Sequence, residues 1–333
     1  MIIVIPLILG ACSLIDDDLT VCGEDFLIEY EMQLHTELQM ELQTELMTET
    51  EYPVRRALEK KWSSIFTDKA KDIDLRFFIT ETDELKHRIK EDNLDSNRTS
   101  YTIKLPKENY MHLGVANIAA DSRVQLSNGN ASETMALRLP DKKELSPLTT
   151  GVFTARLPME VTDSSALFSV CLYMVTAAVA LVVDTAKCPS LRGLEGYMSG
   201  SACSFNIRDS IFMYDKSYAM LLERIPLEGD VNSQQIVRRS SLNLQESPLA
   251  CLATVGFPTQ DESVWSMTVT ATLTENRHTT TTLTVEEPLK AGTIRIIKCM
   301  LDEKGQVIPV NTSEVGATVT LDWKDGGEHE VEL

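Results

Sequence analysis

The sequence predicts an all-β protein of two tandem β-sandwich domains with one short helix. Many short segments alternate between apolar and polar residues, as strands with one buried face do. Turn-forming residues separate these segments at short intervals in both halves of the chain, which is typical of sandwiches. At 333 residues the chain has the length of about two domains.

An apolar run opens the chain and ends in Gly10 and Ala11, directly before Cys12. Small residues let a peptidase approach the backbone, and the cysteine offers a thiol for acyl chains such as palmitate. Leu9–Cys12 therefore resembles the lipobox of bacterial lipoproteins, and we expect residues 1–11 to be a signal peptide and Cys12 the lipidation site. No Lys or Arg precedes the run, which a true start codon further upstream would explain. The alternative is a core strand that contains a cysteine.

Lipid on Cys12 would place the mature chain outside the cytoplasm. Each buried CH₂ contributes about 0.8 kcal/mol and one acyl chain alone holds only marginally, so two or three chains anchor stably. The acidic run Asp16–Asp18 resembles the surface-export signal of outer-membrane lipoproteins of the Bacteroidetes. We expect residues 12–25 to be a lipidated linker and the protein to be surface-exposed at the outer membrane.

The composition is that of a folded chain, with 43% apolar and 24% charged residues. A net charge of −19 and the lack of Lys and Arg clusters argue against nucleic-acid binding. No CxxC occurs, so zinc ribbons find no support. An exported chain could pair some of its other cysteines, and the spacing leaves the connectivity open among Cys22, Cys171, Cys188, Cys203, Cys251 and Cys299.

The segment Ile28–Leu46 places apolar residues on one parity and mostly Glu and Gln on the other. Period two predicts a strand with one buried and one wet face, as in antiparallel sheets. At about 3.3 Å per residue it would span roughly 60 Å, which exceeds ordinary strands. We therefore expect it to bend or to serve two sheets in succession.

One helix is predicted from Pro53 to Phe66, because Pro53 suits a first turn and apolar residues recur at helical spacing. Its opposite face is basic, and we interpret that face as solvated rather than as a binding patch. The apolar positions are Val54, Leu58, Trp62 and Ile65, and the basic ones are Arg55, Arg56, Lys60 and Lys61.

The first half continues with short alternating segments. We predict Asp83–Asn93 to be a loop or a brief helix, because it is rich in charge. The polar, proline-bounded stretch Pro140–Pro147 marks the predicted boundary between an N-terminal sandwich (26–147) and a C-terminal sandwich (148–333). The predicted strands are Ile73–Ile79, Tyr101–Leu105 and Tyr110–Ile118.

The second half contains a long uncharged run, Ser164–Val183, which has the length of a membrane span. It holds Ser, Thr, Cys and Tyr and is flanked by aspartates, so we predict two buried strands joined near Thr176. We predict the Gly- and Ser-rich segment Cys188–Ser204 to be a loop. The other predicted strands are Val152–Val161, Val264–Leu273, Thr279–Val285, Thr293–Leu301, Ala317–Trp323 and Glu328–Leu333.

Catalytic and metal motifs are absent: no HExxH, GxSxG, Walker or GxGxxG pattern occurs. Asp16–Asp18 lacks the spacing and the glycine of a calcium loop. Glu286 and Glu287 could flank a sugar, but 50 carboxylates produce such pairs by chance. Asp184–Ala186 and Asp209–Ile211 resemble the O-glycosylation motif of Bacteroidetes secreted proteins. We expect no catalytic residue, no cofactor and no metal site.

Three features together resemble a known family: the lipid-anchored N-terminus, Trp62–Ile79 leading into Tyr101–Ile118, and Leu172-Tyr173 followed by Ala177–Asp184 and Gly193–Phe205. The chain is similar over nearly its whole mature length to the fimbrillin-associated anchor lipoproteins of the Bacteroidales (FimB-type fimbrial anchor subunits). The resemblance implies two transthyretin-like, Greek-key β-sandwich domains. It also implies a non-catalytic cell-adhesion protein at the base of a fimbrium.

Members of that family tether the filament to the outer membrane and limit its length. The resemblance therefore implies fimbrillin-type stalk subunits as partners, bound by β-strand addition at an unpaired sheet edge. Only Cys12 carries over as a residue assignment. The strand that is exchanged stays open, with the long N-terminal strand and Glu328–Leu333 as candidates.

Two other functions remain open at this point. The first is a surface glycan-binding lipoprotein of a polysaccharide uptake system, although 6% aromatic residues are few for sugar stacking. Trp62 and Trp323 fit core positions, and Trp265 fits either role. The second is a surface hydrolase, which would need two acidic side chains converging in a cleft.

Overall fold

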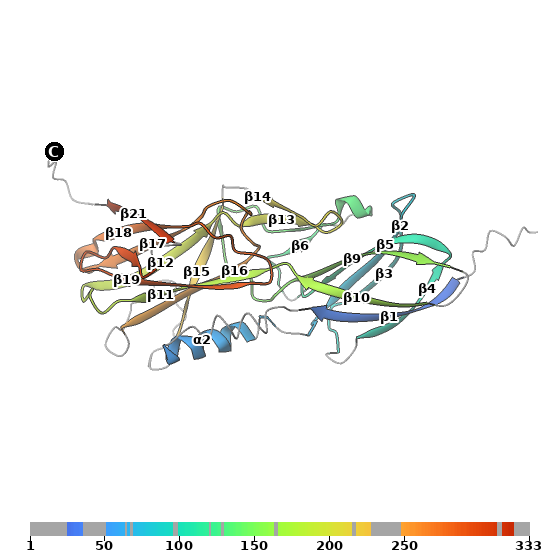
Figure 1. Ribbon diagram of the computed structural model, residues 1–333, viewed down its shortest axis with the longest axis horizontal. Helices are drawn as coiled ribbons and strands as arrows, with labels where there is room; N and C mark the ends of the chain where they lie inside the picture. The colour runs from blue at the N-terminus through green and yellow to red at the C-terminus, as the bar shows by residue number, and fades with distance from the viewer. Residues whose placement is uncertain are drawn as a thin grey trace, which may run out of the picture.

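The computed structural model describes residues 25–35, 51–63, 65–66, 69–95, 99–119, 121–127, 130–162, 166–214, 218–227, 248–311 and 315–322. Within these residues the chain is nearly all β-strand, and α2 (Tyr52–Ser63) is the one α-helix, so the predicted all-β class is confirmed. The strands form two groups side by side along the long axis of the molecule (Figure 1).

The first group is a seven-stranded sheet of order β3-β2-β5-β9-β10-β1-β4. β9 and β10 pair only through Tyr173 with Thr154 and Met174 with Phe153, so the sheet divides at this hairpin. One layer is β3-β2-β5-β9 and the other is β10-β1-β4, and together they form the first sandwich. The strands are β1 (Asp25–His35), β2 (Ile73–Ile79), β3 (Leu85–Glu91), β4 (Ser100–Pro106), β5 (Glu108–Ala116), β9 (Phe153–Val161) and β10 (Ala166–Met174).

β1 is the described part of the long strand predicted at Ile28–Leu46. Ile28, Tyr30 and Met32 are buried, while Glu29 and Gln33 on the other parity are exposed, which confirms the alternation. β1 pairs with β4 in antiparallel and with β10 in parallel orientation. Residues 36–46 of the predicted strand lie outside the described residues.

The second group is a ten-stranded sheet that folds into the second sandwich. β15 pairs with β12 through residues 219–222 and with β16 through residues 223–225, so this strand passes from one layer to the other. The strands are β8 (Glu144–Leu145), β11 (Ala177–Asp184), β12 (Leu191–Ser199), β15 (Ala219–Ile225), β16 (Leu249–Gly256), β17 (Trp265–Leu273), β18 (His278–Val285), β19 (Ile294–Leu301), β20 (Val307–Pro309) and β21 (Val315–Asp322).

A small four-stranded sheet of order β14-β13-β7-β6 accompanies the two sandwiches (Figure 1). Two 3₁₀ turns, η2 (Ser132–Thr134) and η3 (Thr274–Asn276), complete the described elements. The strands of the small sheet are β6 (Gln125–Leu126), β7 (Ala136–Arg138), β13 (Ala202–Asn206) and β14 (Ile211–Tyr214).

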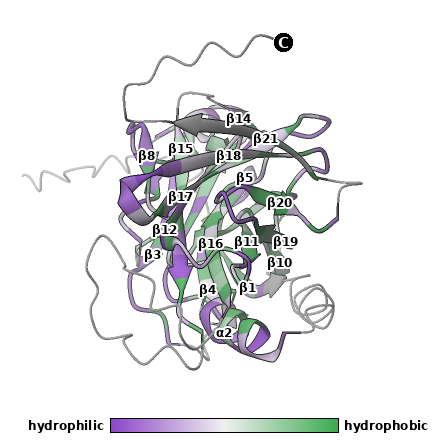
Figure 2. Ribbon diagram, turned by 90° about the vertical axis from the view of Figure 1, so that its left-hand side faces the viewer, coloured by the Kyte–Doolittle hydropathy of each residue, from purple (hydrophilic) through white to green (hydrophobic). Residues whose placement is uncertain are grey.

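β11 is buried on both faces, which explains the long uncharged run of the sequence. Ala178 and Ala180 face the core that also holds Leu58 and Trp62 of α2, whereas Val179 and Leu181 face the interior of the second sandwich. Figure 2 shows β11 and β16 in the middle of the molecule with α2 beside them. A strand covered on both sides needs apolar residues at every position.

The prediction of two strands joined near Thr176 is therefore confirmed by β10 and β11. No helix in the described part of the chain is long and apolar enough to cross a membrane. The predicted helix and the predicted strands from Ile73 to Ile118, Val152 to Val161 and Val264 to Leu301 are confirmed within a few residues. Glu328–Leu333 and Trp323 lie outside the described residues.

Two loop predictions are wrong. Asp83–Asn93 contains β3, whose charges mark it as an edge strand with one outward face. Cys188–Ser204 contains β12 and the start of β13. Gly196 sits inside β12 because a Cβ there would lie 2.8 Å from a methyl group of Leu222, so the glycine allows close packing rather than a turn.

The sheet pairing also crosses the predicted domain boundary. β9 and β10 follow residue 147, yet they pair with β5 and β1 in the first sandwich. Apart from β8, which pairs with β15, the chain enters the second sandwich at β11, after Val175 and Thr176. The division into domains at residue 147 stays a prediction.

Candidate functional site

The predicted lipidation site lies outside the described residues. Cys12, the signal peptide and the acidic run Asp16–Asp18 all precede Asp25, the first described residue. The candidate exchange segment Glu328–Leu333 also lies outside them. The candidate sites within the described residues are therefore of other kinds: open sheet edges, a cluster of charged side chains and the outward faces of strands.

The divided hairpin β9–β10 creates two sheet edges. Residues 155–161 of β9 pair with β5 on one side, and residues 166–172 of β10 pair with β1 on one side. Neither stretch has a ladder partner on its other side among the described strands. β1, in contrast, is paired on both sides over residues 28–31.

The two edges differ in their capacity to accept a strand. β9 contains Pro158, which has no backbone N–H and blunts an edge. β10 has neither proline nor a charged residue, and its outward side chains Leu167 and Tyr173 are 65% and 56% exposed. Of these two edges, β10 is therefore the less protected against strand addition.

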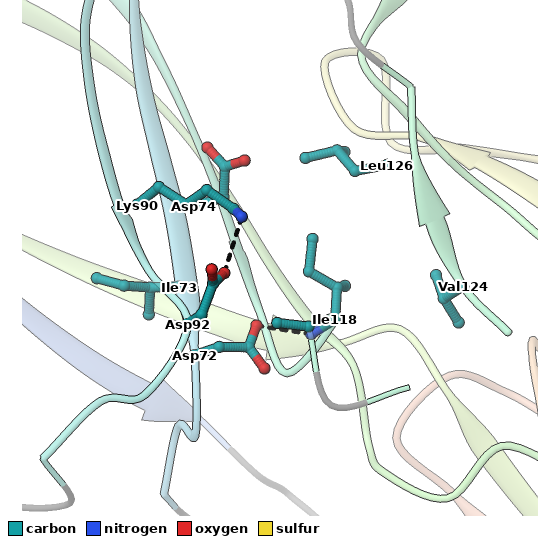
Figure 3. Close-up of a pocket in the computed structure, with 9 residues that line it drawn as sticks. Asp72, Ile73, Asp74, Lys90, Asp92, Ile118, Val124 and Leu126 are labelled. Atoms are coloured by element: carbon teal, nitrogen blue, oxygen red, sulfur yellow. Dashed lines mark hydrogen bonds and ion pairs between the residues drawn. The ribbon is translucent and has the colours of Figure 1, made fainter. Parts of the chain in front are cut away.

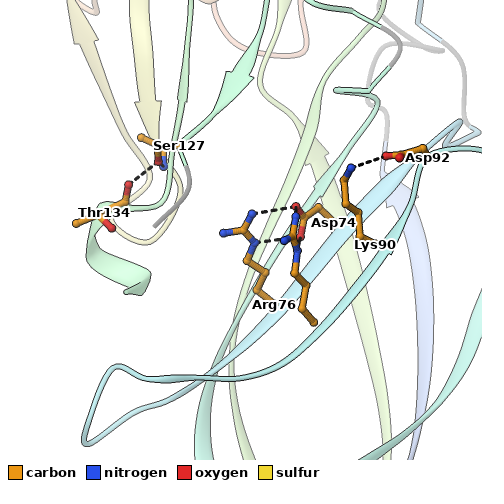
Figure 4. A network of polar contacts seen from close by, with 8 residues as sticks. Asp74, Arg76, Lys90, Asp92, Ser127 and Thr134 are labelled. Carbon is orange, nitrogen blue, oxygen red and sulfur yellow. Dashed lines mark hydrogen bonds and ion pairs between the residues drawn. The ribbon is translucent and has the colours of Figure 1, made fainter. Parts of the chain in front are cut away.

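A buried cluster of charge holds β2 to β3 (Figure 4). The carboxylate of Asp74 accepts two hydrogen bonds from Arg76, both of 3.0 Å, and two from Arg88, of 3.0 and 2.7 Å. Asp74 and Arg76 are buried, while the Arg88 side chain is 40% exposed. Burial alone would raise the pKa of Asp74, but the hydrogen bonds from the two guanidinium groups outweigh it and lower the pKa.

A pocket of about 180 Å³ lies beside this cluster (Figure 3). Its polar wall includes Asp72, whose carboxylate accepts the Ile118 N–H at 2.8 Å, and an ion pair of 2.8 Å between Lys90 and Asp92. Ile118, Val124 and Leu126 form the apolar wall. Ligand sites usually enclose roughly 300–1,000 Å³, so we interpret this pocket as a packing gap between β2 and the segment 118–126.

The interior of the first sandwich contains a second polar pair. The Tyr30 hydroxyl lies 2.9 Å from Nε2 of His112, and Nδ1 of His112 lies 3.0 Å from the backbone oxygen of Arg76. A carbonyl oxygen can only accept, so Nδ1 carries the proton and Nε2 accepts from Tyr30. The rings of His112 and Phe77 stack with centroids 4.4 Å apart. Burial lowers the pKa of His112 to about 4.

The described residues contain no group of three or more His, Cys, Asp or Glu that could hold a metal ion. The acidic pair of the sequence does not converge on a cleft, because Glu287 is exposed and forms an ion pair with Arg295. Trp62 and Trp265 are both core residues, with 0% and 2% exposure. Cys171, Cys188, Cys203 and Cys299 are not disulfide-bonded.

The two glycosylation-like motifs differ in exposure. Thr185 is buried, and its hydroxyl donates a 2.6 Å hydrogen bond to the backbone oxygen of Pro248. Ser210 is exposed and lies in the turn between β13 and β14.

Sequence reasoning missed the Asp74 cluster. Asp74 and Arg76 fall on the parity opposite to Ile73, Leu75 and Phe77, which predicts a wet face rather than a buried one. The available signal was a pair of opposite charges, Asp74 and Arg76, inside an otherwise apolar strand. Charged side chains are rarely buried unless they are paired, so this combination indicates a buried ion pair.

Comparison with known proteins shows that the fold is shared with solved β-rich structures. Neither a protein-family model nor a curated protein matches the chain. A crystal structure named as a candidate polysaccharide-binding protein, from Bacteroides thetaiotaomicron, matches with a TM-score of 0.54 and 8% identity, over 90% of this chain and 99% of that chain. A candidate adhesin from Bacteroides ovatus matches with a TM-score of 0.52 and 10% identity, over 92% and 100%.

The fimbrial anchor protein Mfa2 from Porphyromonas gingivalis also matches, over 89% of this chain and 98% of that chain. The TM-score of that match is 0.47 and its identity is 11%. At 8% and 10% identity, the two matches from Bacteroides show a shared fold.

Proposed function

We propose that this protein is a non-catalytic fimbrial anchor subunit, tethered to the outer membrane by lipid on Cys12. In this proposal it attaches the filament to the cell surface by β-strand addition and limits the length of the filament. The fold shared with candidate adhesins supports a role at the cell surface. The observation that carries the proposal is the open, uncharged edge of β10.

Strand addition at β10 follows from the physics of an unpaired edge. The stretch 166–172 presents backbone N–H and C=O groups without a ladder partner on one side. An extended segment of a stalk subunit would satisfy these groups and continue the layer β10-β1-β4. The partly exposed side chain of Phe168 would give the added strand an apolar contact.

Site-specific photo-crosslinking tests this contact in cells. A photoreactive residue at Ser169, exposed on β10, should give an adduct with a stalk subunit. The same residue at Thr102, exposed on the edge strand β4, is the matched control and should give none. Equal adducts at both positions, or none at Ser169, would show that β10 is not the acceptor.

Cell fractionation of Cys12→Ala tests the anchor, with Cys22→Ala as the control. We expect Cys12→Ala to leave the membrane fraction and the filaments to be shed or altered in length under the electron microscope. If Cys12→Ala stays in the membrane fraction, the lipidation site is wrong. If it is released without any change in the filaments, the anchor role is wrong.

The alternative is a surface glycan-binding lipoprotein of a polysaccharide uptake system. One structural relative is named as a candidate polysaccharide-binding protein, which favours this alternative.

A further inference from the structure

The outward face of β17 and β18 is made almost entirely of hydroxyl side chains. On both strands every second residue is buried in the core of the second sandwich, and the residues between them are half-buried. The half-buried set also includes His278, which pairs with Thr272 at the end of the face; we call the other members the hydroxyl face. Its members are Ser266, Thr268, Thr270, Thr272, Thr280, Thr282 and Thr284.

The strand register arranges this face in straight rows. Tyr197 of β12 pairs with Thr268, Thr268 pairs with Thr282, and Thr282 pairs with Thr318 of β21. One row therefore runs from an aromatic ring across three hydroxyl groups. With about 4.8 Å between strands, the row extends roughly 14 Å. These four strands lie side by side in Figure 1.

Neighbouring hydroxyl groups contact each other across the strands. The Oγ1 atoms of Thr270 and Thr280 are 3.1 Å apart, and those of Thr268 and Thr282 are 3.4 Å apart. Each hydroxyl has one donor and two acceptor sites, so one such contact leaves further capacity for a ligand. The threonine methyl groups add small apolar contacts between the hydroxyl groups.

The hydroxyl face carries no formal charge, although the chain has a net charge of −19. Threonine suits strands in general, which is the purely structural explanation. Several other strands carry charged outward residues: Lys86, Arg88 and Lys90 on β3, Glu29 on β1, and Glu195 on β12, which pairs with Thr270 at the border of the hydroxyl face. A neutral face cannot pair with a charged polymer, and the surrounding negative charge repels an anionic one.

We propose that the hydroxyl face, together with Tyr197, binds a neutral polysaccharide. The Tyr197 ring would stack against the C–H face of one sugar, and the hydroxyl row would exchange hydrogen bonds with the sugars that follow. The inference rests on the glycan-binding alternative. It does not depend on strand addition at β10, which lies in the first sandwich.

Affinity electrophoresis of the full chain tests this proposal. The probes are gels containing a soluble β-glucan, a galactomannan or a xylan, and one gel containing anionic polygalacturonate. We expect retardation in at least one neutral gel and none in polygalacturonate. No retardation in any neutral gel, or retardation in polygalacturonate alone, would overturn the proposal.

Variants of the retarded protein locate the site. Tyr197→Ala, and Thr268→Val combined with Thr282→Val, should each weaken binding by about tenfold, because they remove stacking or hydroxyl groups. Tyr197→Phe keeps the ring and should retain most of the affinity. Thr102→Val on β4 is the matched control and should bind as the unmodified chain does.

Unchanged binding in both Tyr197→Ala and the double valine variant, with unfolding midpoints unchanged, would exclude this face. The valine variant keeps the branched side chain, so it guards against a folding defect in Tyr197→Ala. The same variants should leave filament attachment unaltered. A failure of polysaccharide binding at the hydroxyl face and a failure of membrane anchoring in the Cys12→Ala experiment can therefore be told apart.

Discussion

The hydroxyl of Tyr30 on β1 donates a hydrogen bond to Nε2 of His112 on β5, and this bond joins the two layers of the first sandwich. Both side chains are buried, with 1% and 0% exposure. The ring of Tyr30 also meets the rings of Phe77 and His112 edge-on, with centroids 6.2 and 5.2 Å away. The pair therefore fixes β1 against β5, and the burial of His112 favours its neutral ring.

Stability should fall in mild acid because His112 is buried as a neutral ring. Its pKa is about 4 in the folded chain against an ordinary value of 6.5, so the unfolded chain binds more protons between these values. The contribution of neutral His112 to the free energy of unfolding is complete above about pH 6.5. It is lost as the pH falls toward 4, which lowers the free energy of unfolding by about 3 kcal/mol. Urea unfolding across this range measures it. His112→Gln should lose much of this dependence, whereas His278→Gln should keep it.

Tyr30→Phe should destabilise the chain by about 1–3 kcal/mol, because it leaves Nε2 of buried His112 without a donor. The control is Tyr110→Phe, which removes a 2.9 Å bond to the backbone oxygen of Pro106 in a partly buried position. Its cost should be about 1 kcal/mol or less. Urea unfolding near neutral pH compares the two, and equal losses would contradict the role of the Tyr30 bond.

Asp74→Asn should cost about 3–5 kcal/mol, since it removes the charge of a buried carboxylate that pairs with both Arg76 and Arg88. Asp92→Asn breaks the Lys90 pair, whose side chains are 48% and 57% exposed, and should cost less than about 1 kcal/mol. Chemical unfolding of both variants gives the comparison. Similar small losses would mean that Arg76 finds other compensation.

Cys299 should resist thiol reagents in the folded chain. Burial raises its pKa to about 12, so almost no thiolate forms at mildly alkaline pH. Cys203 is partly exposed and serves as the internal comparison. Maleimide labelling followed by peptide mass spectrometry should modify Cys203 first and Cys299 only on unfolding. Early labelling of Cys299 would contradict the buried position of β19.

Sequence patterns predicted the elements whose burial is set locally. The alternation of Ile28, Tyr30 and Met32 identified one buried face of β1, and helical spacing identified the core side of α2. The uncharged run Ser164–Val183 correctly indicated two strands, of which β11 is buried on both faces and β10 on one face alone. In each case the pattern within one segment is enough to show which residues leave water.

Features that depend on distant partners could not be predicted in this way. Asp74 is buried because Arg88, fourteen positions later, reaches it from β3. The charged residues of Asp83–Asn93 led to the prediction of a loop. An edge strand is also rich in charged residues, because one of its faces is in contact with water. The hydroxyl face depends on the register between β17 and β18, which local composition does not specify. Cys12 stays a prediction.

The double pairing of β1 has a mechanical consequence. A strand at a sheet edge is peeled away one hydrogen bond at a time, whereas β1 lies between β10 and β4 with ladders on both sides. Tension directed along β1 would load these two ladders in shear, so that many hydrogen bonds resist together. The first described strand after Cys12 is therefore built to withstand a lengthwise pull far better than a sideways one.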